Sequence, residues 1–477
     1  MTTEMTEDIM FELIEAYARA AEMAQYGGHD MVQIHGAHGW LLSQFMSPLY
    51  NHRTDKYGGS LENRARFPLM IVDAIRKRCP KLPIEYRFSA NDFMEGGFGP
   101  EEGIEFAKML DGKVALIHIT SSSFFDPSCG KLFPSMFTER GVNIPLAASI
   151  KAAVKTPVCT VGRISDLKQA DEAIARGEVD MVAAGRAFFA DPSWVDKAYH
   201  GHEDEIVPCL RCNKCHVPNG PDLFRTVCTV NPIVGMEDRI STMVKPVGEK
   251  RKVAVVGGGP AGMEFARICA QRGHDVTLYE KSGELGGMLK HAKYPSFKWP
   301  LRQFMDYMIK EMDKLGVHVK LNTTATRELL EKENYQVLAL ALGAEPSSLP
   351  LPGKDGDNVS YAANIYGHED QLGKNVTIIG GGEIGVETGL YLAELGHLVT
   401  VLEMQYDLIL DAPHAHYRNM VVNYWRHTAN FAYQAGVKCT AIDPDGVRYL
   451  DPNGVEQKQQ ADNVLLAIGM KSKQDEA

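Results

Sequence analysis

Residues 252–280 decide the fold of the second half of the chain, and they read KVAVVGGGPAGMEFARICAQRGHDVTLYE. An apolar β run is followed by the spacing G-x-G-x-x-G at Gly257, Gly259 and Gly262, and then by a helical stretch. Glycines at this spacing permit a tight turn, a close approach of the backbone to a pyrophosphate, and close helix–strand packing. The next β run ends at Glu280, at the distance expected for a carboxylate that binds ribose hydroxyls. The segment therefore predicts a dinucleotide site, and a purely structural glycine turn is the alternative.

A second copy of this pattern follows the β run NVTIIGGG, with glycines at Gly380, Gly382 and Gly385. Its next β run, LVTVLE, ends at Glu403. A carboxylate at that place accepts hydrogen bonds from a free 2′-hydroxyl and repels a 2′-phosphate, so NADH is favoured over NADPH. The first copy has a further close-approach glycine at Gly287. Two such units suggest tandem Rossmann-like domains, of which one holds FAD and the other NAD(H).

Four cysteines lie between the two halves of the chain. Two residues separate Cys209 from Cys212, and two separate Cys212 from Cys215. Cys228 lies thirteen positions after Cys215. Three thiolates on one loop and a fourth from nearby fit the corners of a [4Fe–4S] cluster. Zinc is the rival interpretation, although zinc ribbons usually draw their ligands from two separated C-x-x-C pairs. A cluster of free thiols is the third possibility.

Five β runs alternate with helical stretches in the first part of the chain, which is typical of α/β architecture. They are MVQIH (31–35), IEYRFSA (84–90), ALIHITS (115–121), VCTVG (158–162) and MVAAG (181–185). Strand–helix units in series suit a (β/α)8 barrel of the TIM type, but a closed barrel needs eight units and about 250 residues. We therefore expect a partial barrel with about five of its eight units.

Changes of pattern along the chain predict four parts. The partial barrel takes residues 1–201, and an irregular segment with the cysteines takes residues 202–248. The FAD-binding and NAD(H)-binding Rossmann-like domains take residues 249–355 and 356–477. The expected fold class is thus α/β throughout.

The composition is that of an ordinary soluble protein, with 44% hydrophobic and 23% charged residues among 477. The formal net charge of −11 disfavours nucleic acid and anionic membranes as partners, because both are polyanions. No apolar run of transmembrane length occurs, and the acidic N-terminus lacks the features of a signal peptide. We expect a cytoplasmic protein that acts on a small-molecule substrate.

An early stretch closely resembles the Old Yellow Enzyme family, since residues 34–67 read IHGAHGWLLSQFMSPLYNHRTDKYGGSLENRARF. With the cysteines and the two nucleotide units appended, the whole chain resembles the iron–sulfur branch of that family, which includes 2,4-dienoyl-CoA reductase and 2-enoate reductases. The resemblance implies an oxidoreductase with FMN in its barrel, a [4Fe–4S] cluster nearby, and an FAD/NAD(H) module. It also implies that barrel units before the first strand and a segment after the last are missing, so we expect a chain truncated at both ends.

The resemblance implies roles for three residues of the barrel. His35 and His38 would donate hydrogen bonds to the substrate carbonyl oxygen and stabilise its developing enolate charge. From the residues alone, a metal pair or plain loop histidines are the alternatives. Arg87 would lie near the flavin pyrimidine and stabilise the reduced flavin. A surface salt bridge is the alternative for Arg87.

Trp40 is a departure from the family pattern. The family usually has a tyrosine there that donates a proton to the α-carbon of the substrate. Indole is not a practical acid near neutral pH, so the proton has to come from solvent or from another side chain.

Two Gly-Arg pairs follow late strands of the barrel, where such folds often bind phosphate. They are Gly162-Arg163 and Gly185-Arg186. The resemblance implies that they hold the FMN phosphate.

The expected activity is NADH-dependent reduction of the C=C bond of an enoate or enone, with electrons passing from NADH through FAD, the [4Fe–4S] cluster and FMN. Amine oxidation of the trimethylamine dehydrogenase type is one alternative. The other is an inactive fragment or partner subunit. The missing strands could then come from a complementing polypeptide or a homo-oligomer.

Overall fold

The computed structural model describes residues 4–126, 130–164, 166–216, 226–240, 244–410, 412 and 415–473. Contacts within the chain divide it into two units, of which the first ends at Gly185 and the second begins at Arg186. Each unit is considered by itself below. Among the helices of these residues, none combines the length and apolar character needed to cross a bilayer.

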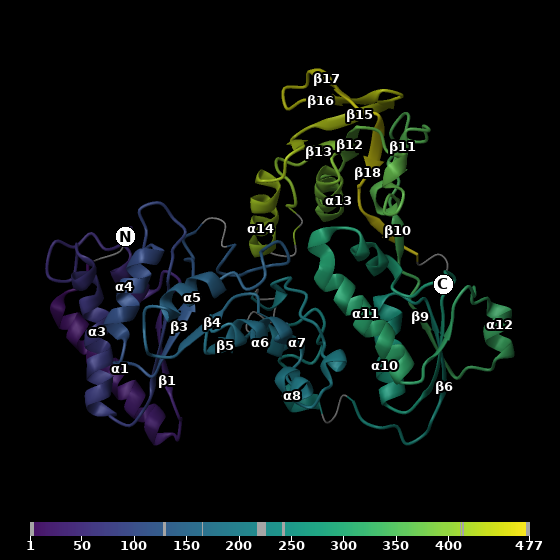
Figure 1. Cartoon of the computed structure of the whole chain (residues 1–477). Helices are drawn as coiled ribbons and strands as arrows, with labels where there is room; N and C mark the ends of the chain where they lie inside the picture. Colours follow the sequence, from purple (N-terminus) through teal and green to yellow (C-terminus); the bar gives the residue numbers. More distant parts are fainter. Residues whose placement is uncertain are drawn as a thin grey trace. The chain divides into compact units, whose positions relative to one another are not determined.

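The first unit is built on a parallel sheet of five strands, which follow one another in chain order (Figure 1). The strands are β1 (Val32–Gly36), β2 (Ile84–Ser89), β3 (Leu116–Thr120), β4 (Val158–Val161) and β5 (Met181–Ala183). All five β runs expected from the sequence are therefore strands of one sheet.

Six helices connect or precede these strands. They are α1 (Glu7–Tyr26), α2 (Leu41–Met46), α3 (Leu61–Arg78), α4 (Pro100–Leu110), α5 (Ile144–Lys151) and α6 (Leu167–Ala175). Helix α3 illustrates why they begin where they do. Ser60 caps its first turn by accepting a hydrogen bond from the backbone N–H of Asn63 at 3.4 Å. Three basic residues lie in its last turn, where their positive charges interact favourably with the negative end of the helix dipole.

The two faces of this sheet differ in character, because neighbouring residues of a strand point to opposite sides. Ile34, Tyr86 and Ile117 are buried in the apolar core that the sheet shares with the helices. Phe106 of α4 closes this core, with its ring centroid 5.5 Å from that of Tyr86. The residues between them, such as Arg87, face the other side. The helices therefore cover one side of the sheet and leave the polar side chains to the other.

The second unit contains two parallel sheets that follow the two glycine motifs. The first has the order β8-β7-β6-β9 and the second the order β11-β18-β12-β13-β14. Strands of the first sheet are β6 (Lys252–Val256), β7 (Asp275–Tyr279), β8 (His318–Lys320) and β9 (Val337–Leu340). Strands of the second are β11 (Val359–Tyr361), β12 (Asn375–Ile379), β13 (Leu398–Leu402), β14 (Phe431–Gln434) and β18 (Asn463–Leu466). Each sheet has the strand–helix–strand arrangement expected from the sequence.

The second unit also has strands outside these two sheets and several helices. Strand β10 (Ala344–Pro346), which follows the first sheet, pairs antiparallel with β19 (Met470–Ser472), which follows the second. Strands β15 (Lys438–Asp443), β16 (Gly446–Leu450) and β17 (Glu456–Gln460) form an antiparallel sheet. The helices are α7 (Arg186–Ala190), α8 (Trp194–Tyr199), α10 (Pro260–Gln271), α11 (Trp299–Lys314), α12 (Arg327–Lys332), α13 (Glu383–Glu394) and α14 (Ala415–Arg426).

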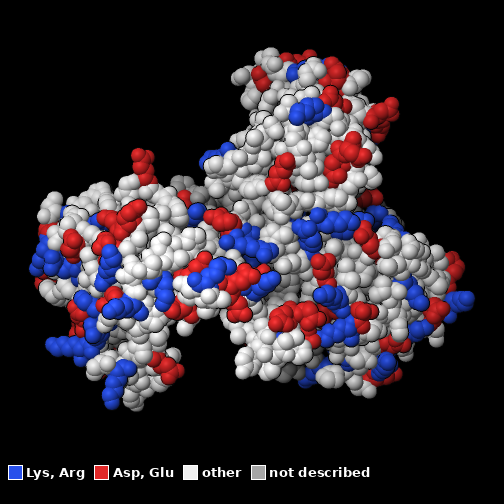
Figure 2. Space-filling view, in the orientation of Figure 1, with Lys and Arg blue, Asp and Glu red and all other residues white. Residues whose placement is uncertain are grey.

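The surface carries both signs of charge. On the face drawn in Figure 2, Lys and Arg side chains are interspersed with Asp and Glu side chains. The visible face therefore presents no broad field of a single sign.

Candidate functional site

A row of polar side chains crosses the face of the first sheet that is turned away from the helices. His35 of β1 is paired in register with Arg87 of β2, Arg87 with His118 of β3, and His118 with Cys159 of β4. Register partners in a parallel sheet point to the same side, so these four side chains share one face. Glu85, two residues before Arg87, lies on that face too. Such a row is unusual for the interior of a sheet and indicates a polar site.

Two nitrogens in this row have no hydrogen-bond partner among the described residues, although both are buried. They are Nε of Arg87 and Nε2 of His118. The other ring nitrogen of His118, Nδ1, lies 2.6 Å from Oε1 of Glu85. This hydrogen bond lowers the pKa of Glu85, while burial lowers the pKa of both His118 and Arg87. Buried polar groups are nearly always satisfied, so these two nitrogens fit a polar group bound on this face, such as the edge of a flavin ring.

His118 and Glu85 were not singled out by the sequence. The available signal was a histidine inside the apolar run ALIHITS, at an alternating position between buried residues. Its significance depends on the strand register, because only the register brings His118 beside Arg87.

His35 and His38 lie together at the end of β1, with ring centroids 5.1 Å apart. His38 has a left-handed backbone, with φ of 65°, which turns the chain after the strand. Its ring Nε2 lies 3.0 Å from the hydroxyl of Thr120, and its backbone N–H donates to the hydroxyl of Ser89 at 3.0 Å. Hydroxyls at the ends of two neighbouring strands therefore hold His38 in place.

Both histidines are neutral near pH 7. Burial, together with the charge of Arg87, lowers the pKa of His38 to about 3. Burial lowers the pKa of His35 as well. A neutral imidazole carries one N–H donor, so each ring can donate a hydrogen bond to a carbonyl oxygen. The geometry therefore suits the carbonyl role expected from the sequence.

Trp40 begins helix α2 beside this pair and is 53% exposed. Its ring makes an edge contact with Phe124, with centroids 5.3 Å apart. The indole N–H can only donate a hydrogen bond and does not ionise near neutral pH. Trp40 therefore offers contact area at the site and no acid.

The four residues expected at the FMN phosphate are divided between the two units. Gly162 and Arg163 follow β4, and Arg163 donates from Nη2 to the carbonyl of Met136 at 3.2 Å. Gly185 follows β5 at the end of the first unit. Arg186 begins the second unit, where its Nη1 donates to Oδ1 of Asn213. A single phosphate site made by all four stays a prediction.

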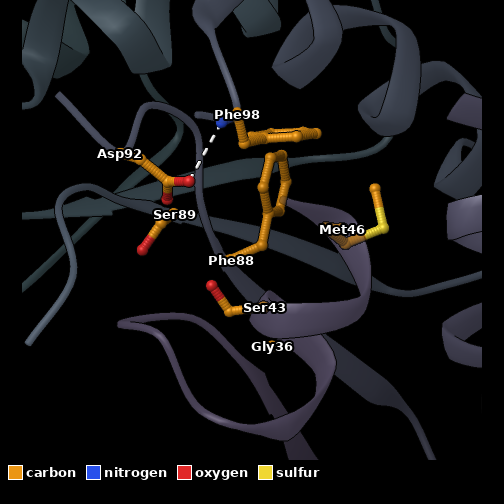
Figure 3. A pocket seen from close by; sticks show the side chains of 7 residues that line it. All are labelled: Gly36, Ser43, Met46, Phe88, Ser89, Asp92 and Phe98. Carbon is orange, nitrogen blue, oxygen red and sulfur yellow. Dashed lines mark hydrogen bonds between the residues drawn. The ribbon is translucent and has the colours of Figure 1, made fainter. Parts of the chain in front are cut away.

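A small pocket lies at the ends of β1 and β2, lined by Gly36, Ser43, Met46, Phe88, Ser89, Asp92 and Phe98 (Figure 3). Asp92 accepts a hydrogen bond from the backbone N–H of Phe98 at 2.9 Å, which folds the segment after β2 over the pocket. The pocket encloses about 10 Å³. This space suits about one water molecule and excludes an organic substrate.

The four cysteines line one pocket in the second unit, and each is partly buried. Nevertheless, among the described residues no three His, Cys, Asp or Glu side chains lie close enough to hold one metal ion. Four thiols that line one space could serve as the ligands of an iron–sulfur cluster or of a zinc ion.

The loop that carries the cysteines has two residues with an uncommon backbone conformation. Arg211 and Asn213 both have left-handed backbones, with φ of 56° and 60°. Asn213 itself lines the pocket beside the thiols, together with Leu210 and Lys214. The guanidinium of Arg211 lies over the ring of Trp299, 4.7 Å from its centroid, and Nδ2 of Asn213 lies 3.5 Å from Sδ of Met420. The cysteine loop is therefore fastened to helices α11 and α14.

The first glycine loop leaves no room for side chains. A Cβ on Gly257, whose φ is 105°, would lie 2.2 Å from the carbonyl oxygen of Ala341. A Cβ on Gly262 would lie 1.9 Å from the carbonyl oxygen of Gly257. Gly259 caps helix α10, and a Cβ there would be 3.8 Å from Cα of Gly287. Gly287 itself adopts φ of 52°. The loop and the helix N-terminus can therefore receive a pyrophosphate at close range.

Glu280 lies at the end of β7, next to this loop. Its carboxylate accepts hydrogen bonds from the backbone N–H groups of Gly258 and Ser282, each at 2.8 Å. Burial alone would raise the pKa of Glu280, but these hydrogen bonds bring it below the usual value. Glu280 is therefore ionised near pH 7 and fits the ribose role expected from the sequence.

The second glycine loop repeats this arrangement. A Cβ on Gly385 would lie 2.0 Å from the carbonyl oxygen of Gly380, and Gly382 caps helix α13. Glu403 at the end of β13 accepts hydrogen bonds from the backbone N–H groups of Gly381 and Gln405. The second unit therefore contains the same combination of glycine loop, helix N-terminus and carboxylate twice.

Comparisons with known proteins cover nearly the whole chain. The NADH:flavin oxidoreductase / NADH oxidase family model matches residues 1–205. The pyridine nucleotide-disulphide oxidoreductase model matches residues 221–333 and 251–477.

Individual relatives are similar over both units. An NADH oxidase of Thermoanaerobacter brockii is 38% identical over 475 residues, which are 98% of this chain and 72% of the relative. A cinnamate reductase of Clostridium sporogenes is 34% identical over 489 residues, 99% of this chain and 73% of the relative. A solved structure of 2-naphthoyl-CoA reductase with 2-naphthoyl-CoA is 35% identical with a TM-score of 0.93, covering 99% of this chain and 71% of that one.

We predict that Gly262→Ala destabilises the second unit by about 1–3 kcal/mol, because its methyl group would collide with the backbone of Gly257. Gly259→Ala is the matched control, since its nearest neighbour is 3.8 Å away. Thermal unfolding of the flavin-free proteins checks this. The same melting temperature for both variants would contradict the steric argument.

The pKa of His38 predicts a pH dependence of stability. Between pH 6.5 and about 3 the unfolded chain protonates His38 while the folded chain does not, so the first unit loses stability as the pH falls through this window. Between pH 7 and pH 5, we expect the free energy of unfolding to fall by on the order of 1–2 kcal/mol less in His38→Asn than in the unmodified protein. Urea unfolding at pH 7 and pH 5 measures this, with the exposed His29→Asn as the control. An equal loss in all three proteins would refute it.

Proposed function

The chain belongs to the NADH:flavin oxidoreductase / NADH oxidase family and is an NADH-dependent flavin oxidoreductase, and on this basis we propose that it reduces the C=C bond of an enoate or enone. The cinnamate reductase among its relatives supports this reaction. The observation that carries the proposal is the neutral pair of His35 and His38 next to Arg87.

The histidine pair would act on the carbonyl group of the substrate. As hydride arrives at the β-carbon, negative charge develops on the carbonyl oxygen. Neutral N–H donors on His35 and His38, held beforehand by the strand end and by Thr120, would stabilise this charge without any rearrangement. The positive charge of Arg87 favours the same anionic oxygen, and burial together with that charge keeps His38 unprotonated.

Arg87, His118 and Glu85 would form the floor of the flavin site. The unpaired nitrogens of Arg87 and His118 would meet the polar edge of the flavin ring. By binding Nδ1 of His118, Glu85 would leave Nε2 of that residue to face the flavin. Gly162, Arg163, Gly185 and Arg186 are proposed at the FMN phosphate.

The proton for the α-carbon would come from water. Trp40 stands where the family usually has its acid, and its exposure indicates that water reaches this edge of the sheet. We propose no side chain of the described residues as the donor.

The second unit would hold the other redox groups. When bound, FMN, FAD and a [4Fe–4S] cluster carry electrons between NADH and the substrate. Cys209, Cys212, Cys215 and Cys228 would ligate the cluster, as their shared pocket suggests. The loop at Gly257 with Glu280 would hold FAD, and the loop at Gly380 with Glu403 would hold NADH. The corresponding domain boundaries, near residues 201, 248 and 355, are part of the proposal.

The function is tested with the anaerobic, flavin-loaded protein. We expect NADH to bleach the flavin absorbance and a simple enone to restore it, with a product two mass units heavier. His38→Ala should lower kcat/KM for the enone by about 10²–10³, as is typical for the loss of a donor to a developing oxyanion. The exposed His29→Ala is the control. Bleaching by trimethylamine but not by NADH would instead establish amine oxidation.

The cluster is tested by iron and acid-labile sulfide analysis of anaerobically purified protein. We expect about four of each per chain. Cys228→Ser should lose most of both, because it removes one of the four pocket thiols. Cys269→Ser is the matched control, a partly buried cysteine of the same unit that does not line the pocket. Equal iron in both variants would disprove the assignment.

A further inference from the structure

The cysteine loop is held on both sides of Cys212. Before it, the guanidinium of Arg211 lies over the ring of Trp299. After it, Nδ2 of Asn213 lies 3.5 Å from Sδ of Met420. Trp299 is the first residue of α11, and Met420 lies within α14. The position of Cys212 therefore depends on how α11 and α14 are placed relative to each other.

A buried carboxylate joins these two helices. Glu387 of α13 forms an ion pair through Oε2 with Nζ of Lys298, the residue before Trp299. Its other oxygen, Oε1, accepts a hydrogen bond from the hydroxyl group of Tyr417, which lies three residues before Met420 on the same side of α14. Glu387 and Tyr417 are each 6% exposed. One carboxylate therefore contacts the neighbours of both residues that hold the cysteine loop.

Glu387 also lies close to the second glycine loop. Helix α13 begins directly after Gly382, and Glu387 lies five residues farther on, about 7.5 Å along the helix axis. A pyrophosphate at this helix N-terminus is negatively charged, and the negative charge of Glu387 would repel it. The ion pair with Lys298 and the hydrogen bond from Tyr417 offset that charge. A change in either partner therefore changes how well the loop binds a pyrophosphate.

Charge at the cysteines acts on the same hydroxyl group. Burial and the charge of Glu387 hold the pKa of Tyr417 well above its usual value, and the charge of Cys212 acts in the same direction. Further negative charge at the cysteine pocket makes the hydroxyl of Tyr417 a weaker donor, because its proton is then held more tightly. Glu387 then keeps more of its own charge and repels a pyrophosphate more strongly. Negative charge at the two places is therefore mutually unfavourable.

Building on the proposed function, we propose that Glu387 and Tyr417 are positioning residues that link the cysteine cluster to the second nucleotide site. An electron at the cluster weakens the binding of the dinucleotide. A bound dinucleotide makes the cluster harder to reduce by the same factor, because such a coupling is reciprocal. The link sets an order of events, in which NAD⁺ leaves the second loop once an electron from NADH has reached the cluster.

The test measures the reduction potential of the cluster in the flavin-loaded protein, with and without ADP-ribose. Electron paramagnetic resonance under argon follows the cluster alone. ADP-ribose carries the pyrophosphate and both riboses of the dinucleotide but no nicotinamide, so it exchanges no electrons. We expect saturating ADP-ribose to lower the potential by about 30–60 mV, which is a 3- to 10-fold change in affinity for a one-electron couple. Calorimetric titration of the oxidised protein establishes saturation.

Tyr417→Phe should abolish this shift, because it removes the hydroxyl group between Glu387 and the cysteine loop. Tyr424→Phe is the matched control and should keep the full shift. Tyr424 donates to Glu394 between the same two helices, seven residues farther along each. Glu387→Gln is a second test, since the amide keeps an acceptor for Tyr417 without the charge, and it should also lose the shift. Iron content and melting temperature establish that each variant retains its cluster and its fold.

The outcomes separate this inference from the proposed function. If ADP-ribose shifts the potential equally in Tyr417→Phe and in the unmodified protein, or in neither, the link is refuted while the proposed cofactors and reaction stand. Loss of the shift in Tyr424→Phe as well would assign it to the packing of α14 and overturn the role of Tyr417. If the unmodified protein lacks the cluster signal or does not bind ADP-ribose, the cofactor assignments are refuted and the link with them.

Discussion

The alternation of side chains along five parallel strands is the constraint on which the candidate active site depends. Because Ile34 and Tyr86 must be buried against the helices, His35, Arg87 and His118 are forced onto the opposite face. A shift of one residue in any strand would exchange the two sets, so the apolar core and the polar row specify the same register. Burying polar nitrogens without partners costs free energy, and this cost favours a polar ligand on that face.

The two glycine loops of the second unit depend on a different constraint, the lack of space for a side chain at a backbone turn. Gly262 and Gly385 approach the carbonyl oxygens of Gly257 and Gly380 more closely than any side chain permits. Both loops therefore adopt the same shape, although their helices and later strands differ in sequence. The cysteine loop also contains left-handed residues, Arg211 and Asn213, and its four thiols line one pocket.

The charges around His38 link its protonation to its chemistry. Burial disfavours a charged imidazole and Arg87 would repel it, so the ring of His38 is neutral and remains a directional donor. The same neighbours that disfavour a proton on His38 favour an anionic oxygen next to it. For His38, burial and neighbouring charge act in the same direction and keep the ring neutral.

The sequence by itself determined the five strands of the first unit, the two glycine loops and the four cysteines, because each of these depends on residues that are close along the chain. It did not identify the pair of Glu85 and His118, nor the backbone contact between Phe124 and His38. These contacts join separate strands, 33 residues apart in the first case, and only the tertiary structure brought them together. The physical reason is that strand register, which local sequence does not specify, decides which side chains meet across a sheet.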